Sequence, residues 1–268
     1  MPWHLGHLMT LSLSGAGLVM IESTAVSYDG RITKKDLALY TDEHQANLQD
    51  MIAMIRLNCE VVLGLQISHA GRKGSANVPW VYQGAPLNKA GGGWETVAPY
   101  ALSRAPAWPT PSRIDDGKMT TIRDDYKSAA LRASKVELDC LEIHMAHGYL
   151  LHEFLSPISN LRSDQYGGNT EKRARFPLEI ASIVRDQWPN DRILGARVTG
   201  SDWVHGGITV NDCIHLVGTL KEIGFDYVCV SSGGILPITN RPSGPGYQVH
   251  LSAEIKRRVD IATRTVGE

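Results

Sequence analysis

Short apolar runs alternate with longer amphipathic stretches along most of the chain. Six runs are nearly continuous in apolar residues, at residues 18–26, 61–68, 140–144, 193–198, 227–231 and 261–266. A strand that is covered on both faces shows this pattern, because neither face meets water. We therefore predict six strands that lie in a buried, largely parallel sheet.

Between these runs, apolar residues recur at helical spacing. Leu48, Met51 and Ile52 are followed by Ile55 at i+7, and Thr41 stands where a helix N-cap is expected. Similar stripes occur within residues 122–133, 176–184, 213–220 and 251–259. Strands that alternate with helices predict parallel strands joined by crossover helices. The uncharged stretch 5–21 is broken by glycines and serines and has no basic residue before it, so we expect a helix that turns into the first strand.

Two parallel architectures compete for such a pattern, the open dinucleotide-binding sheet and the (β/α)8 barrel. The GxGxxG fingerprint of the first is absent from the sequence. Polar residues instead stand at the carboxyl ends of successive strands, where barrel enzymes build their sites. They are Ser23, Gln66, His69, His144, Arg197, Ser231 and Ser232. We therefore predict a TIM (β/α)8-type barrel with about six of its eight strands, forming a single domain over residues 1–268.

Composition narrows the function classes. The 268 residues are 43% hydrophobic with a formal net charge of −1, which gives no electrostatic reason to expect nucleic acid as a partner. No segment is typical of a membrane span. The four cysteines are far apart in sequence and show no CxxC pair, as expected for reduced core thiols. We expect a cytoplasmic protein that acts on small molecules.

The stretch EIHMAHGYLLHEFLSP, residues 142–157, carries the densest candidate chemistry. A zinc site is disfavoured, because Ser156 stands where the second histidine of HExxH would be. Two alternatives remain. His144 and His147 could be ordinary histidines satisfied by neighbouring backbone, or they could donate two hydrogen bonds to one carbonyl oxygen while Tyr149 supplies a proton.

Two further polar residues lie within predicted strands. Arg197 is costly to bury unless it meets an anion, which could be a bound ligand or a core carboxylate such as Glu142. Gln66 offers both a donor and an acceptor, which suits the edge of a heterocycle, but a buried amide tied to the next strand is the simpler alternative.

Several of these segments resemble the old yellow enzyme family. The resemblance rests on QISHAGRKGSANVPW (66–80), on residues 142–176 and on GARVTGSDW (195–203), while GGWETVAPYAL (92–102) is similar to the xenobiotic-reductase-like bacterial branch. The likeness runs over nearly the whole chain. It implies a barrel that binds FMN non-covalently and reduces activated C=C bonds of small electrophilic alkenes, with NADPH or NADH as reductant.

The resemblance also implies residue roles. His144 and His147 would bind the carbonyl oxygen of the substrate, and Tyr149 would be the proton donor. Gln66 would contact the pyrimidine edge of the flavin and Arg197 would lie beside flavin N1. Ser23 falls at a flavin-contacting position. The neighbouring residues 72–73 belong to the same loop as Gln66 but receive no role.

The resemblance predicts that elements are missing. Relatives begin with a strand that this chain lacks, and they continue into final βα units that hold the flavin phosphate. We therefore expect exposed sheet edges, weak FMN binding and association into homo-oligomers. The alternative to an enzyme is a non-catalytic partial barrel that keeps the motif and acts as a binding or interaction protein.

Overall fold

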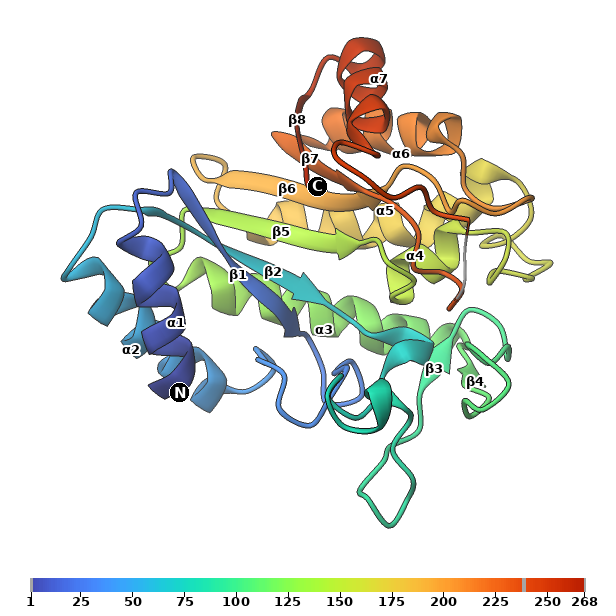
Figure 1. Cartoon of the computed structure of the whole chain (residues 1–268), viewed down its shortest axis with the longest axis horizontal. Coiled ribbons are helices and arrows are strands. Elements are labelled where there is room, and N and C mark those ends of the chain that lie inside the picture. Colours follow the sequence, from blue (N-terminus) through green and yellow to red (C-terminus); the bar gives the residue numbers. More distant parts are fainter. Residues whose placement is uncertain (1, 238–239, 268) are drawn as a thin grey trace.

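Six parallel strands form one curved sheet at the centre of the molecule (Figure 1). The computed structural model describes residues 2–237 and 240–267. The strands follow the order β1 (Leu18–Ala25), β2 (Val62–Ser68), β5 (Cys140–Met145), β6 (Ile193–Thr199), β7 (Tyr227–Ser231) and β8 (Ala262–Thr265). All six predicted strands are confirmed. In this order β1 and β8 are the two edges, so the sheet is an incomplete barrel of the predicted type.

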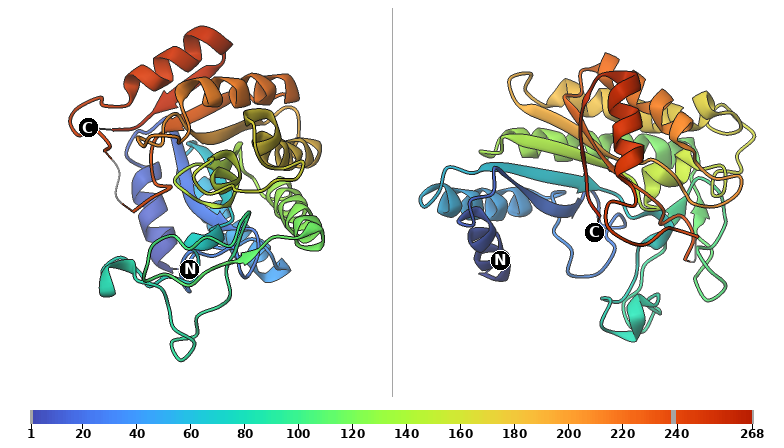
Figure 2. Two further views of the ribbon diagram at one scale, coloured as in Figure 1. Left: turned by 90° about the vertical axis from the view of Figure 1, so that its right-hand side faces the viewer. Right: turned by 45° about the horizontal axis from the view of Figure 1, so that its top comes forward.

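Helices cover one face of this sheet (Figure 2). They are α1 (Pro2–Ser12), α2 (Asp42–Arg56), α3 (Asp116–Ser134), α4 (Leu150–Leu155), α5 (Thr170–Gln187), α6 (Val210–Ile223) and α7 (Val249–Val259). The Thr41 hydroxyl accepts from the His44 N–H as the predicted N-cap of α2. Among the described residues, no helix is long and apolar enough to cross a bilayer.

Along each strand, alternate side chains face either the apolar core beneath the helices or the more polar concave side of the sheet. Leu63, Leu65 and Ile67 of β2 belong to the hydrophobic core, whereas Gly64 and Gln66 have the opposite orientation. The same division recurs on β5, β6 and β7, where Leu141, Ile143, Leu194, Ala196, Val198, Val228 and Val230 join the core. The intervening positions therefore face the concave side of the sheet.

Register aligns these inward positions across the strands. Gln66 pairs with Glu142 in one row, and His144, Arg197, Cys229 and Arg264 form the next row toward the carboxyl ends. Glu142 is fully buried and accepts three hydrogen bonds. They come from Gln66 Nε2 at 2.6 Å, the Tyr227 hydroxyl at 2.8 Å and Arg264 Nη2 at 2.6 Å. One buried carboxylate thus joins four strands.

The long segment between β2 and α3 extends beyond the carboxyl end of β2 (Figure 1). It contains η1 (Gly71–Lys73), η2 (Tyr82–Gly84) and the two-residue strands β3 (Val97–Ala98) and β4 (Ser112–Arg113). These short strands and the six-residue α4 were not predicted. Elements of this length carry too few residues to show a hydrophobic period.

The Glu142 network generates a prediction about stability. Glu142→Gln keeps the shape of the side chain but removes the charge that Arg264 needs. Because Arg264 is partly exposed, we expect a loss of about 2 kcal/mol in the free energy of unfolding rather than the larger loss of a fully buried pair. Urea denaturation measures this. Glu222→Gln, at an exposed position of α6, is the matched control and should have no effect; equal stability of both variants would contradict the assigned role of Glu142.

Candidate active site

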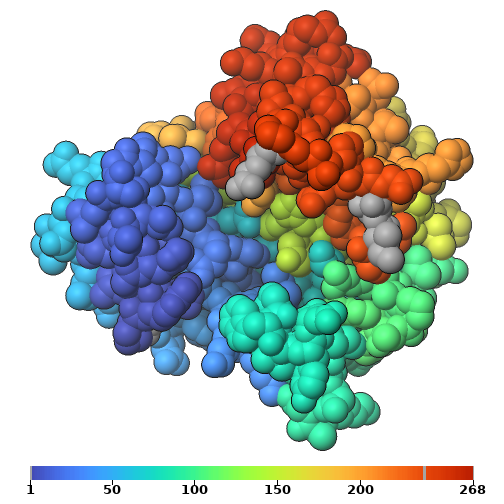
Figure 3. Space-filling model, viewed as in Figure 1, coloured from blue at the N-terminus to red at the C-terminus, as the bar shows by residue number. Residues whose placement is uncertain are grey.

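A cavity of about 500 Å³ lies on the concave side of the sheet, toward the carboxyl ends of the strands. It is lined by every residue that the sequence proposed for the site: Ser23, Gln66, His144, His147, Tyr149 and Arg197. In the space-filling view, the yellow-green segment that follows β5 lies at the bottom of a hollow between the N-terminal and C-terminal parts of the chain (Figure 3). The sheet therefore gathers residues from distant positions in the sequence around one space.

The two histidines bring one ring nitrogen each within hydrogen-bonding distance of the other. Nε2 of His144 lies 3.3 Å from Nδ1 of His147. Burial and the neighbouring His147 hold the pKa of His144 well below its usual range. Burial, together with Arg197 and Lys73, lowers the pKa of His147 to about 3. Both rings are therefore neutral at neutral pH, and each carries one N–H donor.

Neighbouring groups determine which nitrogen carries the proton. The Ala146 N–H donates to Nδ1 of His144, so the proton of this ring is on Nε2. Nε2 of His147 lies 2.7 Å from the Ser231 hydroxyl. When Ser231 accepts, His147 receives the hydrogen bond of His144 on Nδ1. When Ser231 donates, the proton of His147 is on Nδ1, and both rings then offer a donor to one shared acceptor oxygen.

Tyr149 stands beside this pair. Its ring packs edge-on against His144 with the ring centroids 4.8 Å apart, and Lys73 Nζ lies 4.7 Å from the tyrosine ring centroid. Burial and, to a smaller extent, Asp36 raise the pKa of Tyr149 to about 12. The hydroxyl is therefore protonated at neutral pH and can act as a proton donor.

Arg197 has no carboxylate partner in the part of the chain that the structure describes. The alternative of an ion pair with Glu142 is wrong, because Arg264 occupies that position at 2.6 Å. Nε of Arg197 is buried and has no hydrogen-bond partner among residues 2–237 and 240–267. An unpaired guanidinium that lines a cavity is suited to hold a ligand with an anionic or electron-rich atom.

Gln66 and Ser23 complete the predicted set. The amide nitrogen of Gln66 donates to Glu142 on the neighbouring strand, as the structural alternative for this residue anticipated. This bond fixes the orientation of an amide that still lines the cavity. Ser23 lies within an irregularity of the β1–β2 pairing between Ile21 and Thr24, and it borders the same space.

Close backbone contacts hold the loop after β5. Gly148 has φ +73°, and a Cβ on it would lie 2.2 Å from the Gly234 carbonyl oxygen. The Gly148 N–H donates to His152 Nδ1 at 2.7 Å, and the other ring nitrogen of His152 lies 3.0 Å from the buried Asp202. Lys73 Nζ donates to the His147 carbonyl oxygen at 2.6 Å. Contacts from three sides therefore position His147 and Tyr149.

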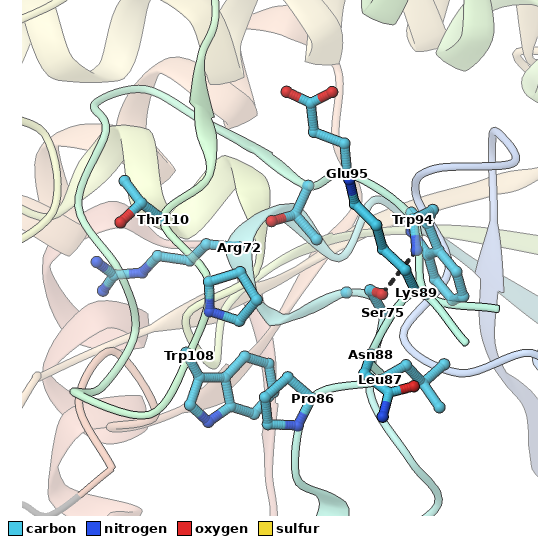
Figure 4. A pocket seen from close by; sticks show the side chains of 14 residues that line it. Arg72, Ser75, Pro86, Leu87, Asn88, Lys89, Trp94, Glu95, Trp108 and Thr110 are labelled. Carbon is cyan, nitrogen blue, oxygen red and sulfur yellow. Dashed lines mark hydrogen bonds between the residues drawn. The ribbon is translucent and has the colours of Figure 1, made fainter. Parts of the chain in front are cut away.

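A separate cavity of about 420 Å³ lies within the long segment between β2 and α3 (Figure 4). Trp94, Trp108 and Pro86 supply apolar walls, and the Trp94 N–H donates to the Ser75 hydroxyl. Arg72 borders it, but its guanidinium is used by the carbonyl oxygens of Leu102 and Ile235. None of the six predicted site residues lines this cavity, so we place the chemistry at the histidine pair.

Comparison with known proteins agrees with this geometry. The model of the NADH:flavin oxidoreductase / NADH oxidase family matches residues 3–268. The chain is 37% identical to NADPH dehydrogenase of Clostridium acetobutylicum, over 99% of this chain and 73% of that protein. It is 39% identical to an NADH:flavin oxidoreductase of Gibberella zeae, over 96% of this chain and 66% of that protein.

The chain belongs to the NADH:flavin oxidoreductase / NADH oxidase family. Solved structures share the fold of this family member. Morphinone reductase in complex with tetrahydroNAD has a TM-score of 0.77 at 24% identity, covering 98% of this chain and 71% of that chain. An old yellow enzyme homologue from Zymomonas mobilis has a TM-score of 0.75 at 21% identity, covering 98% of this chain and 72% of that chain. The predicted old yellow enzyme type is confirmed.

Membership makes the protein a flavin-dependent NAD(P)H oxidoreductase, and the cavity residues fit a flavin. The fit rests on the unpaired buried Nε of Arg197 and on the oriented amide of Gln66, which match the mixed polarity of a flavin pyrimidine ring. Within residues 2–237 and 240–267, no group of three His, Cys, Asp or Glu side chains is arranged to hold a metal ion.

The sequence assigned no role to three residues that line or support the site. Arg264 and Ser231 act through partners that are 122 and 84 residues away in sequence, so no local pattern marks those pairs. Lys73 was noted in the correct loop without a role, and it contacts the carbonyl oxygen of His147. The polar positions at strand ends were the only available signal for Ser231.

The contact between Gly148 and Gly234 generates a second prediction. Gly148→Ala places a Cβ against the backbone and forces a positive φ, so we expect a loss of about 2 kcal/mol or more in the free energy of unfolding. Gly218→Ala is the matched control, because this α6 glycine has open space around it and alanine favours helices. Thermal denaturation of both variants tests the prediction, and a Gly148→Ala protein as stable as the control would refute the close contact.

Proposed function

We propose that this protein is an FMN-dependent ene-reductase that reduces the activated C=C bond of small electrophilic alkenes such as enones. NADPH or NADH is the reductant, and bound FMN supplies the hydride. The proposal specifies the flavin, the bond that is reduced and the role of each residue within the family chemistry. The names and folds of the relatives support this function, and its main structural support is the arrangement of the histidine pair.

The main support is a pair of neutral imidazole nitrogens that lie within hydrogen-bonding distance of one another. Nε2 of His144 and Nδ1 of His147 are 3.3 Å apart, so one acceptor oxygen beside the pair could lie within hydrogen-bonding distance of both. Two hydrogen bonds to a carbonyl oxygen withdraw electrons from a conjugated C=C bond, which makes its β-carbon a better hydride acceptor. Ser231 allows the pair to offer both donors by changing the direction of its own hydroxyl.

Tyr149 is the proton donor in this proposal. It is packed against His144, so a substrate whose carbonyl oxygen is held by the histidines presents its α-carbon near the tyrosine. The raised pKa keeps the hydroxyl protonated until the proton is needed. Arg104 and Arg197 lower the pKa of Tyr149 and so favour the tyrosinate that proton transfer leaves.

Arg197, Gln66 and Ser23 would hold FMN. Their side chains line the cavity from three different strands, with Arg197 and His144 in the same register row. A guanidinium without a carboxylate partner favours a flavin ring with negative charge near N1. Gln66 is oriented by Glu142, so its amide is fixed before the cofactor binds.

A binding experiment tests the histidine assignment. We expect His144→Ala and His147→Ala each to weaken the binding of a phenol about tenfold, because each variant removes one of the two N–H donors to its oxygen. Calorimetric titration of the FMN-loaded protein with 4-chlorophenol measures this, and flavin content should be unchanged. His215→Ala, at an exposed position of α6, is the control.

Two outcomes would count against the function. Unchanged phenol affinity in both histidine variants would contradict the assignment of His144 and His147 as the carbonyl site. A protein that remains colourless after incubation with FMN, and that shows no NADPH- or NADH-dependent reduction of 2-cyclohexenone, would favour a non-catalytic barrel instead.

A prediction for Arg197 concerns the flavin itself. Arg197→Met removes positive charge beside the proposed N1 position, so we expect a lower reduction potential or a loss of flavin affinity. Arg197→Lys keeps the charge and should retain more of both properties. Spectroelectrochemical titration and fluorescence measurement of flavin affinity provide the readouts. A potential and an affinity equal to wild type in Arg197→Met would show that this side chain does not contact the flavin.

A further inference from the structure

A third cavity, of about 540 Å³, borders the proposed carbonyl site, and with that site as the first cavity of the pair it is named the second cavity. His147 lines both cavities, and Ser231, its hydrogen-bond partner, lines the second one. The two cavities therefore meet at His147. The charged side chains of the second cavity differ from those of the first, because all of them are basic.

Three separate segments contribute these charges. Lys73 comes from η1, Arg104 from the long segment before α3, and Arg241 from the segment after β7. None of the three forms an ion pair with a carboxylate in the described part of the chain. Nε of Arg104 is moreover buried without a hydrogen-bond partner there. The fold thus brings together cations that it does not itself neutralise.

Lys73 and Arg104 are withdrawn from water and lie near one another, which is unfavourable unless an anion joins them, whereas Arg241 is exposed at the rim of the cavity. Burial and the neighbouring Arg104 lower the pKa of Lys73 to about 7, although Glu153 opposes this effect. Burial also lowers the pKa of Arg104. A carboxylate or phosphate in the cavity would offset the repulsion and accept hydrogen bonds from the guanidinium groups.

We propose that this second cavity is an anion subsite, which binds a carboxylate or phosphate group of a molecule that reaches the histidine pair. The proposal rests on the proposed function, since it adds a charged group to the class of alkene that the protein accepts. An acidic alkene and the 2′-phosphate of NADPH present the same chemistry to the three cations.

The experiment compares probes that differ by one charged group. Benzoate and benzamide have nearly the same shape, and NADPH differs from NADH by its 2′-phosphate. We measure the affinity of each by calorimetry for the FMN-incubated wild-type protein and for Arg241→Gln and Arg104→Gln. Arg175→Gln is the matched control, because it removes the same charge from an exposed position of α5. Circular dichroism verifies that each variant is folded.

We expect wild type to favour the anionic member of at least one pair about tenfold, and both cavity variants to reduce that preference several-fold. Loss of the benzoate preference alone identifies a substrate carboxylate, and loss of the NADPH preference alone identifies the nucleotide phosphate. The proposal is overturned if wild type shows neither preference, or if Arg175→Gln reduces it as much as the cavity variants. Because these affinities need no alkene reduction, an inactive protein with intact preferences would refute only the proposed function.

Discussion

The register of the parallel strands is the constraint on which the rest of this structure depends. Successive side chains of a strand alternate between faces, so a residue on one strand determines which residues of the other strands share its level in the interior. Gln66 and Glu142 share one level, and His144, Arg197 and Arg264 share the next. A slip of one residue in β5 would send both Glu142 and His144 into the apolar layer beneath the helices. The core therefore enforces the arrangement of the site.

The position of the histidine pair also depends on contacts that hold the loop after β5. His144 lies on a strand, but His147 has φ +59° in the loop that follows, and this loop is held by backbone contacts rather than by regular structure. Gly148 and Gly234 bring the segments after β5 and β7 into direct contact. Ser231, at the end of β7, then meets His147. Because Gly148 and Gly234 have no side chains, the two segments come close enough for Ser231 to contact His147.

Repeated patterns in the sequence predicted the six strands, the main helices and the end of the barrel at which the candidate site lies, whereas the roles of its six residues came from the family resemblance and stay predictions. Near-continuous apolar runs marked the strands, and polar residues at their carboxyl ends marked one end of the barrel. The assignment of partners was not accessible in this way. Glu142 was the expected carboxylate, but its cation is Arg264 rather than Arg197, since both arginines lie on inward positions and only distance in space distinguishes them. The cations of the second cavity come from irregular segments, where no period relates sequence position to direction.

The bond between Glu142 and Arg264 also has a mechanical consequence. These residues belong to β5 and β8, which are separated by β6 and β7. In a flat sheet, three interstrand steps would place their backbones about 14 Å apart. The two side chains bridge this interval and meet at 2.6 Å across the concave face. The bond therefore ties β8 to β5 in addition to the main-chain ladder through β6 and β7, so the C-terminal edge of the sheet is held beside the cavity by side chains as well as by backbone hydrogen bonds.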